Sequence, residues 1–206
     1  MKLVILGATG GIGLELVKQA VERGHSVTAL VRAPERLEAF RDRITIVAGD
    51  LLNSTELTRV LNGHDAVLSS FGPRDPRANG NLLKSFASEL TKAMLHSGIR
   101  RVIVVSVAFL FKDMIIPPAY LVGRMFFAHH VADAAAMEEI LMKSGLDWTI
   151  VRPPRLTDKP LTGTYRVREG HLPRFGFTIS RADVADYMIK AVEDLSSINR
   201  IVGVCN

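Results

Sequence analysis

Three glycines stand at intervals of three residues directly after a short apolar run near the start of the chain. Leu3 to Leu6 is apolar enough for a buried strand, and Gly7-Ala8-Thr9-Gly10-Gly11-Ile12-Gly13 follows it without a break. The apolar residues after this turn recur at helical spacing as far as Ala20, and Gly24 ends the predicted helix. Ser26 to Val31 predicts a second strand. A strand, a glycine turn, a helix and a second strand in this order predict a βαβ unit with parallel strands.

The turn has the chemistry of a phosphate site. Glycine allows the tight turn and leaves room for a phosphate to approach the backbone, and the free N–H groups and positive dipole end of the following helix attract an anion. This context predicts a dinucleotide site. The alternative is a domain of the same fold that has lost binding. The residues that we expect to contact the cofactor here are Gly7, Thr9, Gly10, Gly11, Ile12 and Gly13.

The residue after the second strand discriminates between the two nicotinamide dinucleotides. A site for NAD(H) usually has Asp or Glu there to accept hydrogen bonds from the ribose, whereas this chain has Arg32. Arginine can instead bind the 2′-phosphate of NADP(H), and Arg36 follows one helical turn later. We therefore expect NADP(H). The alternative is that both arginines are solvated surface cations.

Two further strand ends should lie over the cofactor, because parallel strands end at the same edge of a sheet. Asp50 and Leu51 follow the third predicted strand, Ile44 to Ala48, and Asp50 could accept from the adenine amino group or could simply be a turn residue. Phe71 and Gly72 follow the fourth predicted strand, Ala66 to Ser70. There Gly72 would let the backbone pass close to adenosine and the phosphates, or would form a plain turn.

Strand and helix patterns alternate along the rest of the chain. The predicted fold is α/β, a Rossmann-type doubly wound parallel sheet in one domain spanning 1–206, with a small β-rich substrate cap at 153–180. Asn53 and Ser180 are predicted to begin helices, and Gly63, Gly98 and Gly145 to end them. The later predicted elements are a strand over Val102 to Val107, a long helix over Pro117 to Lys143, a strand over Asp147 to Val151, a helix over Arg181 to Asp194 and a strand over Arg200 to Val204.

Composition narrows the class of partner. The net charge is +5, but the basic residues are dispersed, which favours an anionic small molecule over nucleic acid. The longest uncharged apolar stretch, Val102 to Phe111, is too short to cross a membrane, and the N-terminus does not have the pattern of a secretory signal. The single Cys205 excludes an intramolecular disulfide and is compatible with a reducing cytoplasm.

The six histidines lack the spacing of metal ligands, so we expect no metal. We expect a monomer or weak homo-oligomer.

Several segments together resemble the atypical short-chain dehydrogenases, in particular the NmrA-like NAD(P)-binding proteins and the biliverdin IXβ reductases, which are also NADPH-dependent flavin reductases. These segments are the glycine turn, Val31-Arg32, Ala48-Gly49-Asp50, Ser106-Val107-Ala108-Phe109-Leu110, Arg152-Pro153-Pro154, Asp158 to Tyr165 and Ile179 to Ala185. The resemblance covers nearly the whole chain. It implies that Ser106 and Pro154 lie near the nicotinamide.

The chain departs from that reductase group at two pocket positions. Val107 stands where the reductases have a serine, and Arg155 stands where they have a histidine. Ser106 is then the nearest candidate hydroxyl, and Arg155 could attract an anionic acceptor or form a structural salt bridge. Tyr120 with Arg124 resembles the Tyr-x-x-x-Lys pair of standard short-chain dehydrogenases, with packing as the alternative role. The candidate catalytic residues are Ser106, Tyr120 and Arg155.

These features predict an NADPH-dependent reductase that transfers hydride to a planar conjugated acceptor, namely a flavin, a quinone or a tetrapyrrole, and we expect this acceptor to be anionic. A flavin or quinone can take its proton from water, so the missing histidine does not exclude the reaction. The alternative is a nonenzymatic NADP(H) sensor of the NmrA-like type. A sugar-nucleotide epimerase is a third hypothesis, for which the cap is small.

Overall fold

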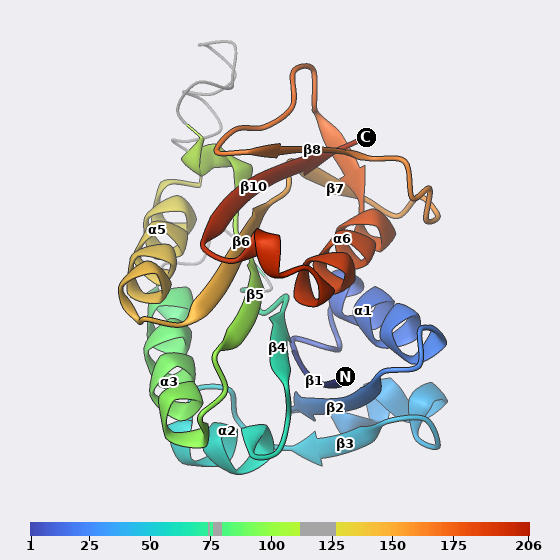
Figure 1. The fold of residues 1–206 in the computed structure, drawn as a ribbon, viewed down its shortest axis with the longest axis vertical. Coiled ribbons are helices and arrows are strands. Elements are labelled where there is room, and N and C mark those ends of the chain that lie inside the picture. Colours follow the sequence, from blue (N-terminus) through green and yellow to red (C-terminus); the bar gives the residue numbers. More distant parts are fainter. Residues whose placement is uncertain (74, 76–79, 112–126) are drawn as a thin grey trace.

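The computed structural model describes residues 1–73, 75, 80–111 and 127–206, which form a central sheet with helices on both faces (Figure 1). The sheet has eight strands in the order β3-β2-β1-β4-β5-β6-β10-β8, parallel except for β8, which runs antiparallel to β10. This order confirms the predicted doubly wound fold. The strands are β1 (Lys2–Leu6), β2 (Ser26–Val31), β3 (Thr45–Ala48), β4 (Ala66–Ser69), β5 (Arg101–Val105), β6 (Asp147–Arg152), β8 (Arg166–Glu169) and β10 (Arg200–Cys205).

The helices divide between the two faces of the sheet. Helices α1 (Gly11–Glu22) and α6 (Arg181–Glu193) pack together on one face. Helices α2 (Ser54–Leu61), α3 (Leu82–Ser97) and α5 (Ala128–Lys143) cover the other. Both faces of the inner strands are therefore buried, which is why β1, β2, β4 and β5 are apolar along most of their length, whereas the edge strand β8 is exposed.

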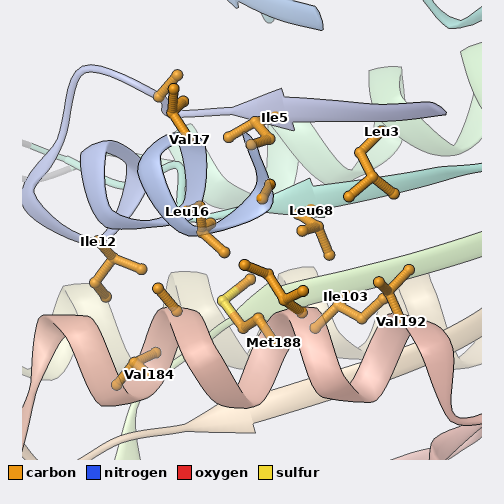
Figure 2. Close-up of a cluster of buried hydrophobic side chains, with 14 of the residues drawn as sticks. Leu3, Ile5, Ile12, Leu16, Val17, Leu68, Ile103, Val184, Met188 and Val192 are labelled. Carbon is orange, nitrogen blue, oxygen red and sulfur yellow. The ribbon is translucent and has the colours of Figure 1, made fainter. Parts of the chain in front are cut away.

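Strand β1 shows how one apolar run serves both layers. Its side chains alternate, so Leu3 and Ile5 face α1 and α6 while Val4 and Leu6 face α2 and α3. Figure 2 shows Leu3 and Ile5 in the first of these clusters, with Met188 of α6 on the opposite side of the same cluster. All four side chains are fully buried, so the strand that leads into the glycine turn is fixed on both sides.

The predicted helix signals are confirmed. The Asn53 side chain accepts hydrogen bonds from the N–H groups of Thr55 and Glu56, and the Ser180 hydroxyl accepts one from the N–H of Asp183. The predicted terminating glycines all have positive φ: Gly24, Gly63, Gly98 and Gly145. The described residues also form three 3-10 helices: η1 (Pro34–Phe40), η2 (Ala108–Leu110) and η3 (Leu195–Ser197).

Two predicted boundaries are wrong. The strand predicted to reach Val107 ends at Val105, because the chain turns there into η2. The long helix predicted from Pro117 does not run through Phe127, whose backbone (φ −116°, ψ 19°) is the N-cap of α5 and whose ring stacks on Phe109. Residues 117–126 of that prediction lie outside the described residues.

The segment predicted as a cap belongs partly to the central sheet. Its middle strand is β8, which extends the sheet at the β10 edge, while β7 (Arg155–Thr157) and β9 (Thr178–Ser180) form a separate two-stranded parallel sheet. The loop between β7 and β8 is tied to α6, since the Asp183 carboxylate accepts from the N–H groups of Thr162 and Gly163, each at 2.9 Å. Sequence reasoning missed β7, which begins directly after Pro153-Pro154.

Candidate functional site

The order of the strands reverses between β1 and β4, and the glycine turn lies at this switch point. Strands β2 and β3 follow β1 on one side, and β4, β5 and β6 continue on the other. In open α/β sheets, ligands bind at the carboxyl ends of the strands where the order reverses. The topology therefore places a candidate site directly after Leu6 and Ser69, the last residues of β1 and β4.

The glycines of the turn are required by close backbone contacts. Gly7 has φ +78°, and a Cβ there would stand 2.7 Å from the backbone nitrogen of Phe71. A Cβ on Gly13 would stand 2.1 Å from the carbonyl oxygen of Gly7. The Gly10 N–H donates to that same oxygen at 3.0 Å, which closes the turn. The first and third glycines of the motif thus let β1, β4 and α1 meet without side chains between them.

Helix α1 begins with a free positive end. Its N-cap is Gly10, so no side chain accepts from the first N–H groups, and its first turn has no acidic residue. Unsatisfied N–H groups and the helix dipole together favour an anion at this position. The start of α1 therefore fits a pyrophosphate, as the sequence predicted.

A cleft of about 540 Å³ opens at this point. It gathers the turn, the end of β2 and the loops after β3 and β4 around one space. Its lining residues are Gly7, Thr9, Gly10, Gly11, Leu30, Val31, Arg32, Ala33, Arg36, Leu51, Ser70, Phe71 and Gly72. Most of the predicted cofactor residues thus meet in one cleft, although they come from four separate segments of the chain.

Arg32 and Arg36 enter this cleft from β2 and η1. Both side chains are exposed, and neither makes an ion pair or a side-chain hydrogen bond with any described residue. Within the described part of the chain, no acidic residue lines the cleft. Two guanidinium groups are therefore available to an anion, which fits a 2′-phosphate better than a bare ribose.

Five of the predicted cofactor residues do not line the cleft, and two of these, Ser106 and Pro154, lie near the ends of β5 and β6. The Asp50 Oδ1 accepts from the N–H of Leu52 at 3.1 Å, which is the hydrogen bond of the alternative turn role. Gly13 lies beneath the turn, against Gly7 and Ala8. Ile12 is buried, and Figure 2 shows its side chain directed toward Val184 of α6, so only its backbone remains for a cofactor.

The candidate catalytic residues lie around the ends of β5 and β6. Ser106 is 6% exposed, and its hydroxyl has no hydrogen-bond partner among the described residues. Pro154 is half-buried in the link from β6 to β7, and Arg155 is exposed without an ion pair to any described residue. The salt-bridge alternative for Arg155 thus finds no support in the described structure. Tyr120 and Arg124 lie outside the described residues.

Arg152, three residues before Arg155, already forms an ion pair. Arg152, the last residue of β6, donates through Nε and Nη2 to the two carboxylate oxygens of Glu138 on α5, at 3.0 and 2.5 Å. The ring of Phe111 lies 4.7 Å from the centre of the same guanidinium. Because Arg152 and Glu138 are both mostly buried, this pair holds α5 against the sheet and leaves Arg155 as the available cation.

Sequence reasoning missed the cleft position of Ser70. This residue follows β4, and its hydroxyl lies 3.5 Å from the Gly7 carbonyl oxygen, so it lines the cleft beside the turn. Its position at the end of the fourth predicted strand could have indicated that it lines the cleft.

The comparison with protein families decides the broad identity of this site. A family model described as NAD(P)H-binding matches residues 7–195, from the first glycine of the turn to the end of α6 and beyond. The chain belongs to the NAD(P)H-binding family. The cofactor of this family agrees with the glycine turn, the free end of α1 and the cleft that they share.

Two curated relatives and one solved structure illustrate the relationship. The chain is 31% identical to an uncharacterized sugar epimerase of Bacillus subtilis, YhfK, over 97% of this chain and 92% of the relative. It is 30% identical to an uncharacterized chloroplastic protein of Arabidopsis thaliana, over 98% of this chain and 75% of the relative. A short-chain dehydrogenase/reductase of Veillonella parvula in complex with NADP has the same fold, with a TM-score of 0.84, 21% identity and coverage of 100% and 94% of the two chains.

The cellular compartment of the protein is not determined by its fold. None of the helices in the described ranges is long and apolar enough to cross a membrane. Since one relative is called chloroplastic, the cytoplasmic location stays a prediction.

Proposed function

We propose that this NAD(P)H-binding protein is an NADPH-dependent oxidoreductase that transfers hydride to a planar conjugated acceptor: a flavin, a quinone or a tetrapyrrole. The observation that carries the cofactor preference is the pair Arg32 and Arg36, which have no partner among the described residues and stand in a cleft whose described lining is free of acidic residues. The Veillonella structure, which holds NADP, supports the same preference.

The chain's own residues fit this cofactor along its length. Arg32 and Arg36 would hold the 2′-phosphate, and the first N–H groups of α1 would hold the pyrophosphate. Gly72 has open space where a Cβ would be, which leaves the cleft unobstructed beside the adenosine. NADPH bound there supplies the hydride.

The acceptor side has a cation but few groups for acid–base chemistry. Arg155 is exposed and free of described partners, so it could attract a flavin phosphate or a propionate. The buried Ser106 hydroxyl has an unused donor that could orient a carbonyl of the nicotinamide or of the acceptor. Reduction of a flavin or quinone needs no more than this, because water can deliver the proton.

The reaction is tested by following NADPH absorbance with FMN, an uncharged quinone and biliverdin. We expect turnover with at least one of them. If Arg155 recruits anionic acceptors, Arg155→Gln lowers kcat/KM for FMN about tenfold and leaves the uncharged quinone unchanged. Oxidation of NADPH at the buffer rate with every acceptor, in protein that binds NADPH tightly, would contradict the reductase proposal.

A nonenzymatic NADP(H) sensor is the second candidate. The observation that favours it is the replacement of two pocket residues, with Val107 and Arg155 where the resembling reductases have serine and histidine. Such a sensor would bind NADP⁺ and NADPH with clearly different affinities and would change its binding to a protein partner accordingly. Equal affinity for both redox forms would argue against this candidate.

A further inference from the structure

Arg181, the first residue of α6, extends its side chain across the start of α1. A Cβ built on Gly11 would stand 2.5 Å from Cδ of Arg181 and 2.7 Å from its Nε. Gly11 is both the first residue of α1 and part of the cleft lining. The missing side chain at Gly11 therefore makes room for the arginine, and this brings a cation to the end of α1 that fits a pyrophosphate.

The guanidinium of Arg181 has one partner in the described structure. Its Nη1 donates to Oδ1 of Asp158 at 2.5 Å, and the Asp158 side chain is 90% exposed. An ion pair this open to water contributes little free energy. The pair can therefore exchange for a stronger anion at small cost, and the remaining N–H groups of Arg181 have no other described acceptor.

The backbone that carries Arg181 is fixed relative to α1. The Ser180 hydroxyl accepts from the Asp183 N–H at 2.9 Å, and the Gln19 side chain of α1 donates to the Ala182 carbonyl oxygen at 2.9 Å. Figure 2 shows Ile12 above Val184, so the two helices lie side by side at the ends from which they start. Only the outer part of the Arg181 side chain is then free to move.

We propose that Arg181 clamps the pyrophosphate of the dinucleotide, and that Asp158 holds the guanidinium when no dinucleotide is bound. This inference rests on the proposed cofactor site. A guanidinium matches phosphate oxygens with two parallel hydrogen bonds, which makes the pyrophosphate a stronger partner than the exposed carboxylate. Asp158 thus competes with the cofactor for Arg181.

Arg181→Met and Asp158→Asn test the clamp by calorimetric titration with NADPH, NADH and 2′-AMP. Methionine keeps an apolar stem beside Gly11 and removes the charge. Because both dinucleotides carry the pyrophosphate, we expect Arg181→Met to weaken each about tenfold. Binding of 2′-AMP, which lacks the pyrophosphate, should not change. Asp158→Asn should strengthen dinucleotide binding about twofold to threefold, and this gain should disappear in the double variant.

Arg200→Met is the matched control. It breaks an equally short exposed ion pair, with Glu169, at the start of β10 and so at the opposite end of the sheet from the cleft. It should leave all affinities unchanged, and thermal unfolding should show that each variant is folded. If the unmodified protein binds NADPH while Arg181→Met binds as tightly and Asp158→Asn shows no gain, the clamp is wrong and the cofactor site stands. If the unmodified protein binds neither dinucleotide, both proposals are wrong.

Discussion

The carbonyl oxygen of Gly7 occupies the space into which a side chain on Gly13 would project, since a Cβ on Gly13 would stand 2.1 Å from it. Gly10 contacts the same oxygen differently: a Cβ on Gly10 would stand 3.3 Å away and would meet nothing else. The third glycine of the motif is thus a packing requirement, while the middle one faces the cleft and can serve cofactor binding.

This difference predicts opposite outcomes for two alanine substitutions. Gly13→Ala should lower the free energy of unfolding by about 3 kcal/mol, because backbone atoms must move apart. Gly10→Ala should cost only about 1 kcal/mol, because alanine is a poorer N-cap than glycine but its Cβ meets little else, yet it should weaken NADPH at least about tenfold. Chemical unfolding and NADPH titration of both variants check this. Equal loss of stability would contradict the division of roles.

Gly72 offers a second test of where the cofactor lies. A Cβ at this residue would meet no atom of the described residues within 4 Å, and the residue lines the cleft. Gly72→Val should therefore fold normally and reduce NADPH affinity, because its methyl groups would occupy the space of the adenosine. Gly80→Val is the control, since Gly80 also has open space around it but lies outside the cleft lining. Unimpaired NADPH binding by Gly72→Val would place the adenosine elsewhere.

Asp183 makes stability depend on pH in the acid range. Burial acts to raise the pKa of this carboxyl, but hydrogen bonds from the Asn206 and Ser180 side chains and from the N–H groups of Gly163 and Thr162 outweigh it and lower the pKa to about 2. The ordinary value is 3.8, so the stabilisation is complete above about pH 4 and is lost as the pH falls toward 2.

Asp183→Asn should thus cost about 2 kcal/mol at pH 7, because a charged acceptor of several hydrogen bonds is lost. The difference from the unmodified protein should shrink between pH 4 and pH 2. Urea unfolding at several pH values measures this difference. A constant difference down to pH 2 would show that folding does not lower the pKa of Asp183.

Local patterns predicted the part of the site that local geometry builds. The glycine turn, the helix that follows it and the arginine after β2 lie within the first 32 residues, where hydrophobic periodicity and turn chemistry determine the structure. The same holds for the helix signals at Asn53 and Gly98, whose predicted roles the structure confirms.

Contacts between distant segments escaped prediction. Arg181 over Gly11 joins residues that are far apart in the chain, and only the packing of α6 on α1 brings them together. Strand β7 was missed because it is three residues long and exists through its pairing with β9, as in Arg155 opposite Thr178. At Asp50 a local contact was overlooked instead. Its carboxylate accepts a hydrogen bond from the N–H of Leu52, and this bond competes with the predicted contact to the adenine.

Arg32, directly after β2, is the residue that we expect to select NADP(H) over NAD(H). The decisive measurement is the dissociation constant of NADPH and of NADH for the unmodified protein and for Arg32→Asp. We predict that the substitution weakens NADPH about a hundredfold, because a charge-assisted contact is replaced by repulsion of the 2′-phosphate, and leaves NADH within about threefold. Equal losses for both dinucleotides would contradict the assignment of this cleft to the 2′-phosphate.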